Sequence, residues 1–92
     1  MNNEEVFYGR YFIVKRVPNN LDFSRFGIIA SKKTGGAVTR NRIKRLGREV
    51  MRSQQFSGFF DIVLIAKRLC AEADFNAVSV DLAHILHKAG LI

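Results

Sequence analysis

The chain has 92 residues, 48% of them hydrophobic, and a formal net charge of +7. This length and apolar content are typical of one folded domain over residues 1–92 and exclude an intrinsically disordered chain. No apolar run approaches the roughly 20 residues of a membrane span, and the acidic start of the chain is unlike a secretory signal.

The first third of the chain is predicted to form the end of a short helix and then a β-hairpin. Residues 1–8 are interpreted as the helix, which Gly9 closes. Residues 11–17 (YFIVKRV) are rich in β-branched and aromatic side chains, as strands are, and the turn sequence Pro18-Asn19-Asn20 ends them. Residues 25–31 (RFGIIAS) are expected to return as the second strand of the hairpin.

An amphipathic helix is expected over residues 39–53, with Thr39 as its N-cap. Gly35-Gly36 before it form a flexible connection that lets backbone N–H groups approach an anion. The apolar side of the helix, expected to pack on a sheet, carries Ile43, Leu46, Gly47 and Val50. The opposite side is almost purely cationic and carries Arg40, Asn41, Lys44, Arg45, Arg48 and Arg52. Arg42 and Glu49 lie between the two sides.

The last third is predicted to be a strand, a loop and a helix. Residues 61–67 (DIVLIAK) are continuously apolar after Asp61, which indicates a strand buried on both faces or central in its sheet. Residues 67–73 are a loop, and Asp74 caps a helix over residues 75–89 that Gly90 ends. The core stripe of this helix is Phe75, Val78, Leu82, Ile85, Leu86 and Ala89. This order of elements favours a two-layer α+β domain.

Other apolar side chains are expected to be structural. Leu21 and Phe23 are expected to pack beneath the hairpin loop. Core positions are also predicted for Phe26, Phe56, Phe59 and Phe60. The one cysteine, Cys70, excludes an internal disulfide, fits a reducing compartment and is predicted to be a small core residue. We therefore expect a cytoplasmic protein without a membrane partner.

Residues 32–52 carry a concentrated positive charge. The segment holds eight of the fifteen Lys and Arg residues and one acid, Glu49, so the rest of the chain is electrically balanced. Like charges four residues apart, such as Arg40 and Lys44, each destabilise an isolated helix by roughly 0.2–0.5 kcal/mol. A polyanion would remove most of this cost, and nucleic-acid phosphate is the commonest one.

The sequence shows no catalytic constellation. Nucleolytic chemistry by side chains needs paired carboxylates, a metal-binding acid cluster or an activated histidine. The eight acids stand singly except for Glu4-Glu5. His84 and His87 have a spacing that can hold a metal, but without a third ligand nearby they are expected to be surface residues. We expect no catalytic residue, no metal site and no cofactor bound by the protein alone.

The run SKKTGGAVTRNRIKRL, residues 31–46, resembles the signature of the bacterial ribonuclease P protein family, in which a strand ending in SVSKK leads through a glycine-containing loop into the RNR helix. The likeness continues in Val6-Phe7, Gly9 and Phe12 and in residues 61–66 and 71–75. It implies a subunit that binds the catalytic RNA and the 5′ leader of precursor tRNA during endonucleolytic 5′-end maturation. The active site and its Mg²⁺ ions would belong to the RNA.

The resemblance also implies which residues touch RNA. Carried over residue by residue, the RNA-facing set is Lys32, Lys33, Arg40, Asn41, Arg42, Lys44, Arg45 and Arg48, and the charge pattern adds Arg52. A cleft between the first helix and the sheet would take the leader, with Phe7, Phe12 and Lys15 as candidates. The aromatic residues available for stacking on unpaired bases are Phe7, Tyr8, Tyr11 and Phe12.

The family fold implies a mixed, four-stranded-type sheet in which the RNR helix makes a left-handed β-α-β crossover, against the general right-handed rule. Three departures from the family pattern have consequences. Only five residues precede Val6, which predicts a truncated first helix, and few residues link Gly9 to Phe12. Gly47 stands where the family usually has a larger apolar residue, which predicts a softer contact between helix and sheet.

Three rival functions remain open on the residues. A ribosomal or RNA-chaperone protein would bind structured RNA without a leader-dependent effect. A DNA-binding module would place the helix in a major groove. The cationic side of this helix is wider than such binding needs, and no dimerisation segment is evident, so no DNA partner is expected. A stand-alone nuclease would need the catalytic residues that are missing.

Overall fold

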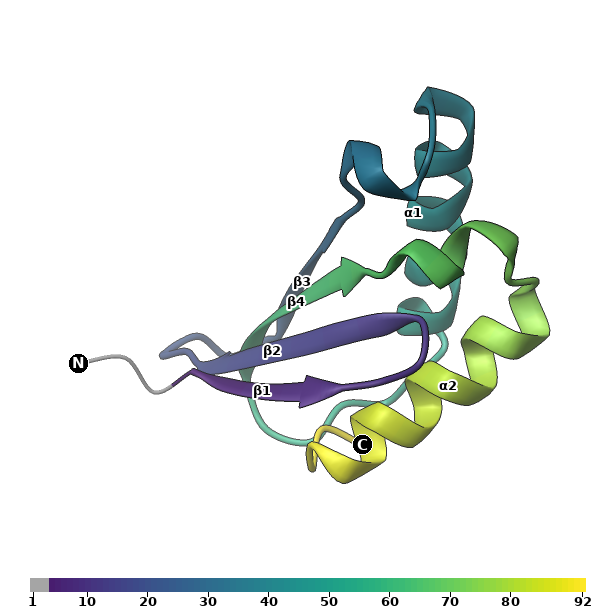
Figure 1. Ribbon diagram of the computed structural model, residues 1–92. Coiled ribbons are helices and arrows are strands. Elements are labelled where there is room, and N and C mark those ends of the chain that lie inside the picture. Colours follow the sequence, from purple (N-terminus) through teal and green to yellow (C-terminus); the bar gives the residue numbers. More distant parts are fainter. Residues whose placement is uncertain (1–3) are drawn as a thin grey trace.

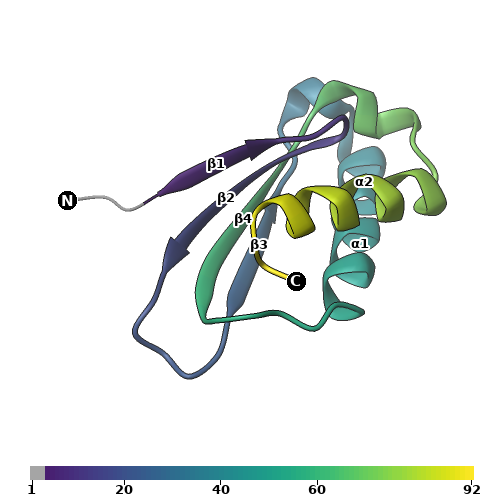
Figure 2. The same cartoon turned by 90° about the horizontal axis from the view of Figure 1, so that it is seen from below.

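The computed structural model describes residues 4–92 as a four-stranded sheet with two α-helices on one of its faces (Figure 1; Figure 2). The elements are β1 (Glu5–Tyr8), β2 (Phe12–Pro18), β3 (Arg25–Ile29), η1 (Lys32–Thr34), α1 (Ala37–Arg52), β4 (Phe60–Ala66), η2 (Arg68–Glu72) and α2 (Phe75–Lys88), where η denotes a 3₁₀ turn. The two-layer α+β class predicted from the sequence is confirmed.

The sheet is mixed, with strand order β1-β2-β4-β3. β2 runs antiparallel to both β1 and β4, whereas β3 runs parallel to β4. The predicted hairpin of β2 and β3 is therefore wrong, because β4 lies between them. The loop that joins β2 to β3 is instead bonded to the start of β4: the N–H of Asn19 donates to the Phe59 carbonyl (3.2 Å) and the N–H of Phe60 to Ser24 Oγ (3.0 Å).

The hairpin that the chain does form joins β1 to β2. Residues 5–8 are a strand, so the predicted helix is wrong over these residues, and residues 1–3 lie outside the described part of the chain. A strand suits this segment because it pairs side chains across the hairpin: Glu5 lies opposite Arg16 and forms a salt bridge with it (2.5 Å). Within residues 4–92, no helix precedes β1.

Gly9 belongs to the tight turn between β1 and β2 and does not close a helix. The turn lies against α2 so closely that a Cβ on Gly9 would fall 1.9 Å from Ile85 Cδ1. The Asp81 carboxylate of α2 accepts hydrogen bonds from the N–H groups of Arg10 (3.1 Å) and Tyr11 (3.0 Å), and Lys67 Nζ donates to the Gly9 carbonyl (2.6 Å). The short link from Gly9 to Phe12 is thus held by α2 and by Lys67, the N-cap residue of η2.

The helices begin in different ways. α1 begins at Ala37, and its N-cap is Gly36, which makes no side-chain capping bond; the predicted cap, Thr39, lies inside the first turn. α2 has the predicted cap, since Asp74 Oδ1 accepts from the N–H of Ala77 (2.8 Å). α1 connects the adjacent parallel strands β3 and β4, as expected for a β-α-β crossover. The left-handed sense of that crossover stays a prediction.

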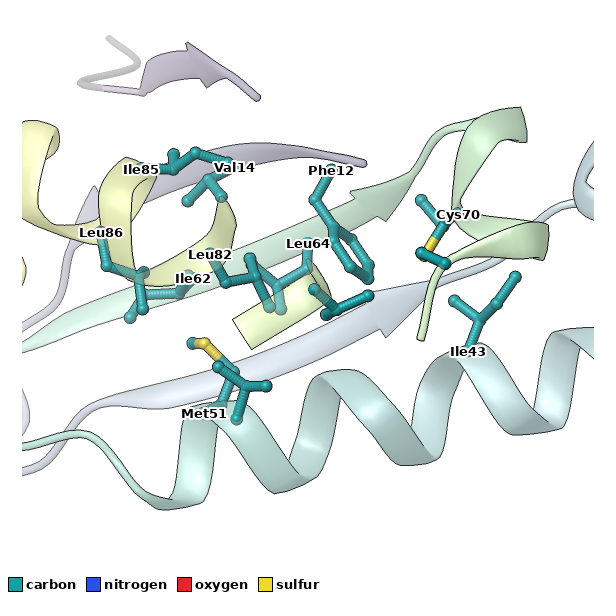
Figure 3. Close-up of a cluster of buried hydrophobic side chains, with 14 of the residues drawn as sticks. Phe12, Val14, Ile43, Met51, Ile62, Leu64, Cys70, Leu82, Ile85 and Leu86 are labelled. Carbon is teal, nitrogen blue, oxygen red and sulfur yellow. The ribbon is translucent and has the colours of Figure 1, made fainter. Parts of the chain in front are cut away.

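The core lies between the sheet and the two helices (Figure 3). Phe12 and Val14 of β2 and Ile62 and Leu64 of β4 point into it, and the alternation places their sequence neighbours on the opposite, open face of the sheet. The helices contribute Ile43, Val50, Met51, Val78, Leu82, Ile85 and Leu86. Cys70 is fully buried as predicted.

The prediction of a core position is wrong for four residues. Phe59 and Phe75 are 50% and 45% exposed, and Leu21 and Phe23 are also exposed. Their positions explain this: Leu21, Phe23 and Phe59 lie on the loops at one end of the sheet, and Phe75 begins α2. The other predicted phenylalanines, Phe26, Phe56 and Phe60, are partly buried against the core.

The helix-to-sheet contact at Gly47 is close and not soft. A Cβ built on the buried Gly47 would fall 2.7 Å from Ile28 Cδ1 of β3. The Ile28 side chain therefore fills the space that a larger residue on α1 would take, which explains how this chain accommodates its departure from the family pattern.

Candidate nucleic-acid interface

The outer side of α1 presents most of the predicted RNA-facing residues together. Its inner side is fixed against the sheet and α2 by Ile43, Gly47, Val50 and Met51, all of them buried. Residues on the other side consequently face solvent, and Lys32 and Lys33 of η1 stand exposed just before them. We define the α1 cationic surface as Lys32, Lys33, Arg40, Asn41, Lys44, Arg45, Arg48 and Arg52, of which Arg40 and Lys44 are partly buried and the rest exposed.

No carboxylate of residues 5–92 forms a salt bridge with the α1 cationic surface. The salt bridges Arg16–Glu5 and Arg25–Asp61 both lie on the sheet. Glu49, the one acid of α1, is exposed and pairs with none of its neighbours. The repulsion expected from the sequence is thus present in the folded protein, and a bound polyanion would relieve it.

The N-terminus of α1 adds to this positive potential. No side chain caps the helix, so its first N–H groups remain available and the positive end of the helix dipole is uncompensated. Gly36, the N-cap, has open space where a Cβ would stand. Arg40 Nε is buried and has no hydrogen-bond partner among the described residues. Strong positive potential is therefore concentrated at this end of the molecule.

Arg42 is placed differently from its neighbours. Its guanidinium donates to the carbonyls of Ala73 (Nη1, 3.0 Å) and Ala71 (Nη2), and the side chain is partly buried. The expectation that Arg42 faces RNA does not fit this position, because two of its nitrogens already serve the protein itself.

The leader candidates Phe7, Phe12 and Lys15 do not lie together. Phe12 is 0% exposed and fills the core, so its ring is not available to RNA, which corrects the expectation from the resemblance. Phe7 lies opposite Val14 and packs on the same, helix-covered face. Lys15 is on the open face, next to Val6 on β1.

The exposed aromatic ring on the open face of the sheet belongs to Tyr8, one of the four aromatic residues predicted to be available for stacking but not one of the three leader candidates. Tyr8 is 69% exposed and lies opposite Ile13, two residues from Lys15, on the face away from the helices. Around them the face is mostly apolar: Val6, Ile13, Val17, Gly27, Ile29, Val63 and Ile65. The alternation of β1 would have shown that Tyr8 and Phe7 point to opposite faces, had these residues been interpreted as a strand.

The two histidines lie on the surface and the one cysteine lies in the core. His84 and His87 are exposed, and among residues 4–92 no three His, Cys, Asp or Glu side chains are close enough to hold a metal ion. Burial raises the pKa of the Cys70 thiol to about 11, so the thiol is neutral and unreactive at physiological pH.

An open pocket of about 490 Å³ lies between the β1–β2 turn and α2, lined by Arg10, Tyr11, Ala77, Val80, Asp81 and His84. No described helix is long and apolar enough to cross a membrane.

Comparison with known proteins gives one consistent result. A family model described as Ribonuclease P matches residues 1–90. The ribonuclease P protein component of Dehalococcoides mccartyi is 41% identical over 86 residues, which cover 94% of this chain and 72% of that protein. The corresponding protein of Fusobacterium nucleatum is 44% identical over 92 residues and is covered to 83%.

Solved structures agree with the sequence comparisons. A Staphylococcus aureus RNase P protein, a mutant with defective mRNA degradation activity, superimposes with a TM-score of 0.90 at 32% identity, over 98% of this chain and 78% of that one. The RNase P protein of Thermotoga maritima gives a TM-score of 0.85 at 32% identity, over 94% and 84%. These findings favour the ribonuclease P subunit over a ribosomal or RNA-chaperone protein. The chain belongs to the ribonuclease P protein family.

Proposed function

We propose that this chain, as the protein subunit of ribonuclease P, binds the catalytic RNA through the α1 cationic surface. The observation that carries the proposal is the row of arginines and lysines on α1 and η1, with which no carboxylate of residues 5–92 forms a salt bridge. Phosphate contacts would supply the missing negative charge, and exposed arginines such as Arg45 and Arg48 could also stack on bases. Binding should weaken steeply with salt, because each neutralised phosphate releases counterions.

Ribonuclease P protein components are parts of an endoribonuclease complex, and we place the active site of this complex in the RNA. The protein would contribute by positioning and by electrostatics. The Mg²⁺ ions of the reaction would be held by the RNA. The complex would work in the cytoplasm on precursor tRNA.

We further propose that the single-stranded 5′ leader lies along the open face of the sheet. Sequence-tolerant binding of a single strand combines aromatic rings, on which bases stack, with cations that follow the backbone. Tyr8 supplies an exposed ring and Lys15 a cation on the same face. Arg25 is tied to Asp61 (2.7 Å), so it is less available for phosphate than Lys15 is. Phe7 and Phe12 are not part of this proposal, because both face the helices.

Reconstitution with the cognate catalytic RNA at low Mg²⁺ concentration tests both proposals. The protein should stimulate cleavage of precursor tRNA and should favour the leader-bearing substrate over mature tRNA. Tyr8→Ala and Lys15→Ala should reduce this leader preference and leave binding of the catalytic RNA unchanged, whereas Arg45→Ala should weaken RNA binding. His84→Ala, on the exposed side of α2, is the matched control and should change neither property.

The protein alone is the second control. Without the catalytic RNA it should cleave neither precursor tRNA nor an mRNA. The mRNA substrate is included because the Staphylococcus aureus relative is a mutant with defective mRNA degradation activity. Cleavage by the protein alone would contradict an active site in the RNA. Failure to stimulate the catalytic RNA would contradict the subunit function itself.

A further inference from the structure

We infer that Arg42 is a positioning residue: its guanidinium holds α1 to the segment that joins η2 to α2 and is not available to RNA phosphate. Arg42 lies among the cations of the RNR motif, so the inference divides that motif into RNA-facing residues and one residue that serves the fold. The inference rests on the proposed function only where it assigns RNA contacts to the other arginines of α1.

The geometry of the guanidinium carries the inference. Nη1 donates to the Ala73 carbonyl at 3.0 Å and Nη2 donates to the Ala71 carbonyl, acceptors that lie 31 and 29 residues further along the chain. The planar fork of an arginine suits two acceptors two residues apart, whereas a lysine ammonium is a point charge without this geometry. Arg45, three residues along the helix, is exposed and has no protein acceptor among residues 4–92.

The two carbonyls are suited to a cation. Ala73 is the C-cap of η2, and carbonyls at the end of a helical turn have no partner further along that turn. The C-terminal end of a helix also carries partial negative charge. Ala73 and the neighbouring Cys70 are buried, so water cannot easily replace the guanidinium. Removal of the Arg42 side chain would therefore leave part-buried acceptors unsatisfied, which is costly.

The position of these carbonyls explains what the bond does. Ala73 directly precedes Asp74, the N-cap of α2, and η2 also packs on η1, which carries Lys32 and Lys33. Arg42 thus joins α1 to the start of α2 and to the turn that supports the two lysines. The bond would stabilise the folded position of α1 relative to the start of α2, so Arg42 would support the α1 cationic surface without itself contacting phosphate.

The test compares Arg42→Gln with Arg45→Gln, which remove the same charge from the same helix. The probe is a bacterial ribonuclease P RNA transcript, and binding is measured from 50 to 400 mM KCl. Arg42→Gln should lower the melting temperature by about 5–15 °C and leave the slope of log K against log salt unchanged. Arg45→Gln should leave the melting temperature unchanged and make that slope shallower by about 0.7–0.9.

Arg42→Lys separates charge from geometry. It keeps the positive charge but should not restore the melting temperature, because an ammonium cannot replace the two-nitrogen fork. Full restoration of the melting temperature by Arg42→Lys would overturn the inference. So would a shallower salt slope for Arg42→Gln, whether or not its stability falls. An unchanged slope for Arg45→Gln would defeat the proposed RNA interface instead, and the melting temperatures would still decide the role of Arg42.

The wild-type protein gives a readout that does not depend on a variant folding. Nitrogen-15 NMR of the guanidinium groups should show restricted rotation for Arg42 in the free protein and rapid rotation for Arg45. Addition of a short RNA duplex should perturb Arg45 and leave Arg42 unchanged. A freely rotating Arg42 guanidinium, or one that responds to RNA as Arg45 does, would overturn the inference.

Discussion

The two helices, α1 and α2, cover the same face of the sheet (Figure 2). Both bury apolar side chains against it, but the side chains that they expose to solvent differ in character. The outer side of α2 is mixed, with Asn76, Ser79, Val80, His84 and His87. The outer side of α1 is almost entirely cationic. Because both helices pack on the sheet with an apolar inner side, packing does not require this difference between their outer sides, and the difference supports α1 as the helix that we propose to bind RNA.

The comparison extends to the helix termini. α2 has a capping aspartate, whereas α1 begins at a glycine without a side-chain cap and carries Gly47 in its middle. Like charges, a missing cap and a central glycine each lower the stability of an isolated helix. The helix that carries the candidate interface is therefore intrinsically the weaker of the two, and packing must supply most of its stability.

If the inner sides are equivalent, truncation of either should have a similar and large effect. Ile43→Ala on α1 and Leu82→Ala on α2 both remove fully buried side chains (Figure 3) and should each lower the free energy of unfolding by about 2–5 kcal/mol. Urea unfolding followed by circular dichroism measures both. A loss below about 1 kcal/mol for Ile43→Ala alone would show that α1 depends less on the core than α2 does.

Charge reversal on the outer sides should separate the helices. Arg45→Glu combined with Arg48→Glu replaces two exposed cations of α1 and should lower affinity for ribonuclease P RNA by more than about 100-fold at low salt. His84→Glu combined with His87→Glu places two carboxylates on α2, which is half of that change in net charge, and should lower it by less than about 3-fold. Filter binding measures both, and a loss for the α2 variant that is half as large on a logarithmic scale would show that net charge, and not the α1 cationic surface, governs binding.

The helix caps predict a smaller difference. Asp74→Ala removes the carboxylate that accepts from the N–H of Ala77 and should cost about 1 kcal/mol of unfolding free energy. Thr39→Ala, at the position that the sequence predicts as the cap of α1, should cost clearly less, because Thr39 lies inside the helix and makes no capping bond. Thermal unfolding of the two variants gives the comparison; similar losses would argue that Thr39 has a capping role.

Much of the fold follows from local patterns. The apolar periodicity of α2, its cap at Asp74 and the central position of β4 are all properties that neighbouring residues determine, and the sequence predicted them. Strand pairing is different, because it depends on which segments meet in space. The pattern of residues 11–31 is that of a hairpin, and only the insertion of β4 between β2 and β3 shows otherwise.

The candidate site divides in the same way. The cationic side of α1 could be predicted because helical periodicity separates it from the core. Phe12 was misassigned since the residue type fits both stacking and packing, and only the face of β2 decides between them. Arg42 could not be assigned from sequence, because its acceptors, Ala71 and Ala73, are backbone groups that no residue type reveals.

The N-cap of α1 tests whether the features that lower the stability of this helix also favour RNA binding. The expected effects are the smallest of those predicted here. Gly36 has an extended backbone that other residues can adopt and open space for a Cβ. Gly36→Asp should therefore raise the free energy of unfolding by about 0.3–1 kcal/mol, through a new cap and a favourable interaction with the helix dipole. The same carboxylate would stand beside the α1 cationic surface and should weaken RNA binding by about 3–10-fold, because it repels phosphate.

Gly36→Asn is the matched control, since asparagine caps a helix about as well as aspartate but carries no charge. It should add a few tenths of a kcal/mol to the stability of the fold and leave RNA affinity unchanged. If both variants weaken binding equally, the backbone N–H groups that a capping side chain covers are themselves needed by the RNA. If neither does, the N-terminus of α1 lies outside the interface, and the contacts with RNA begin further along the helix.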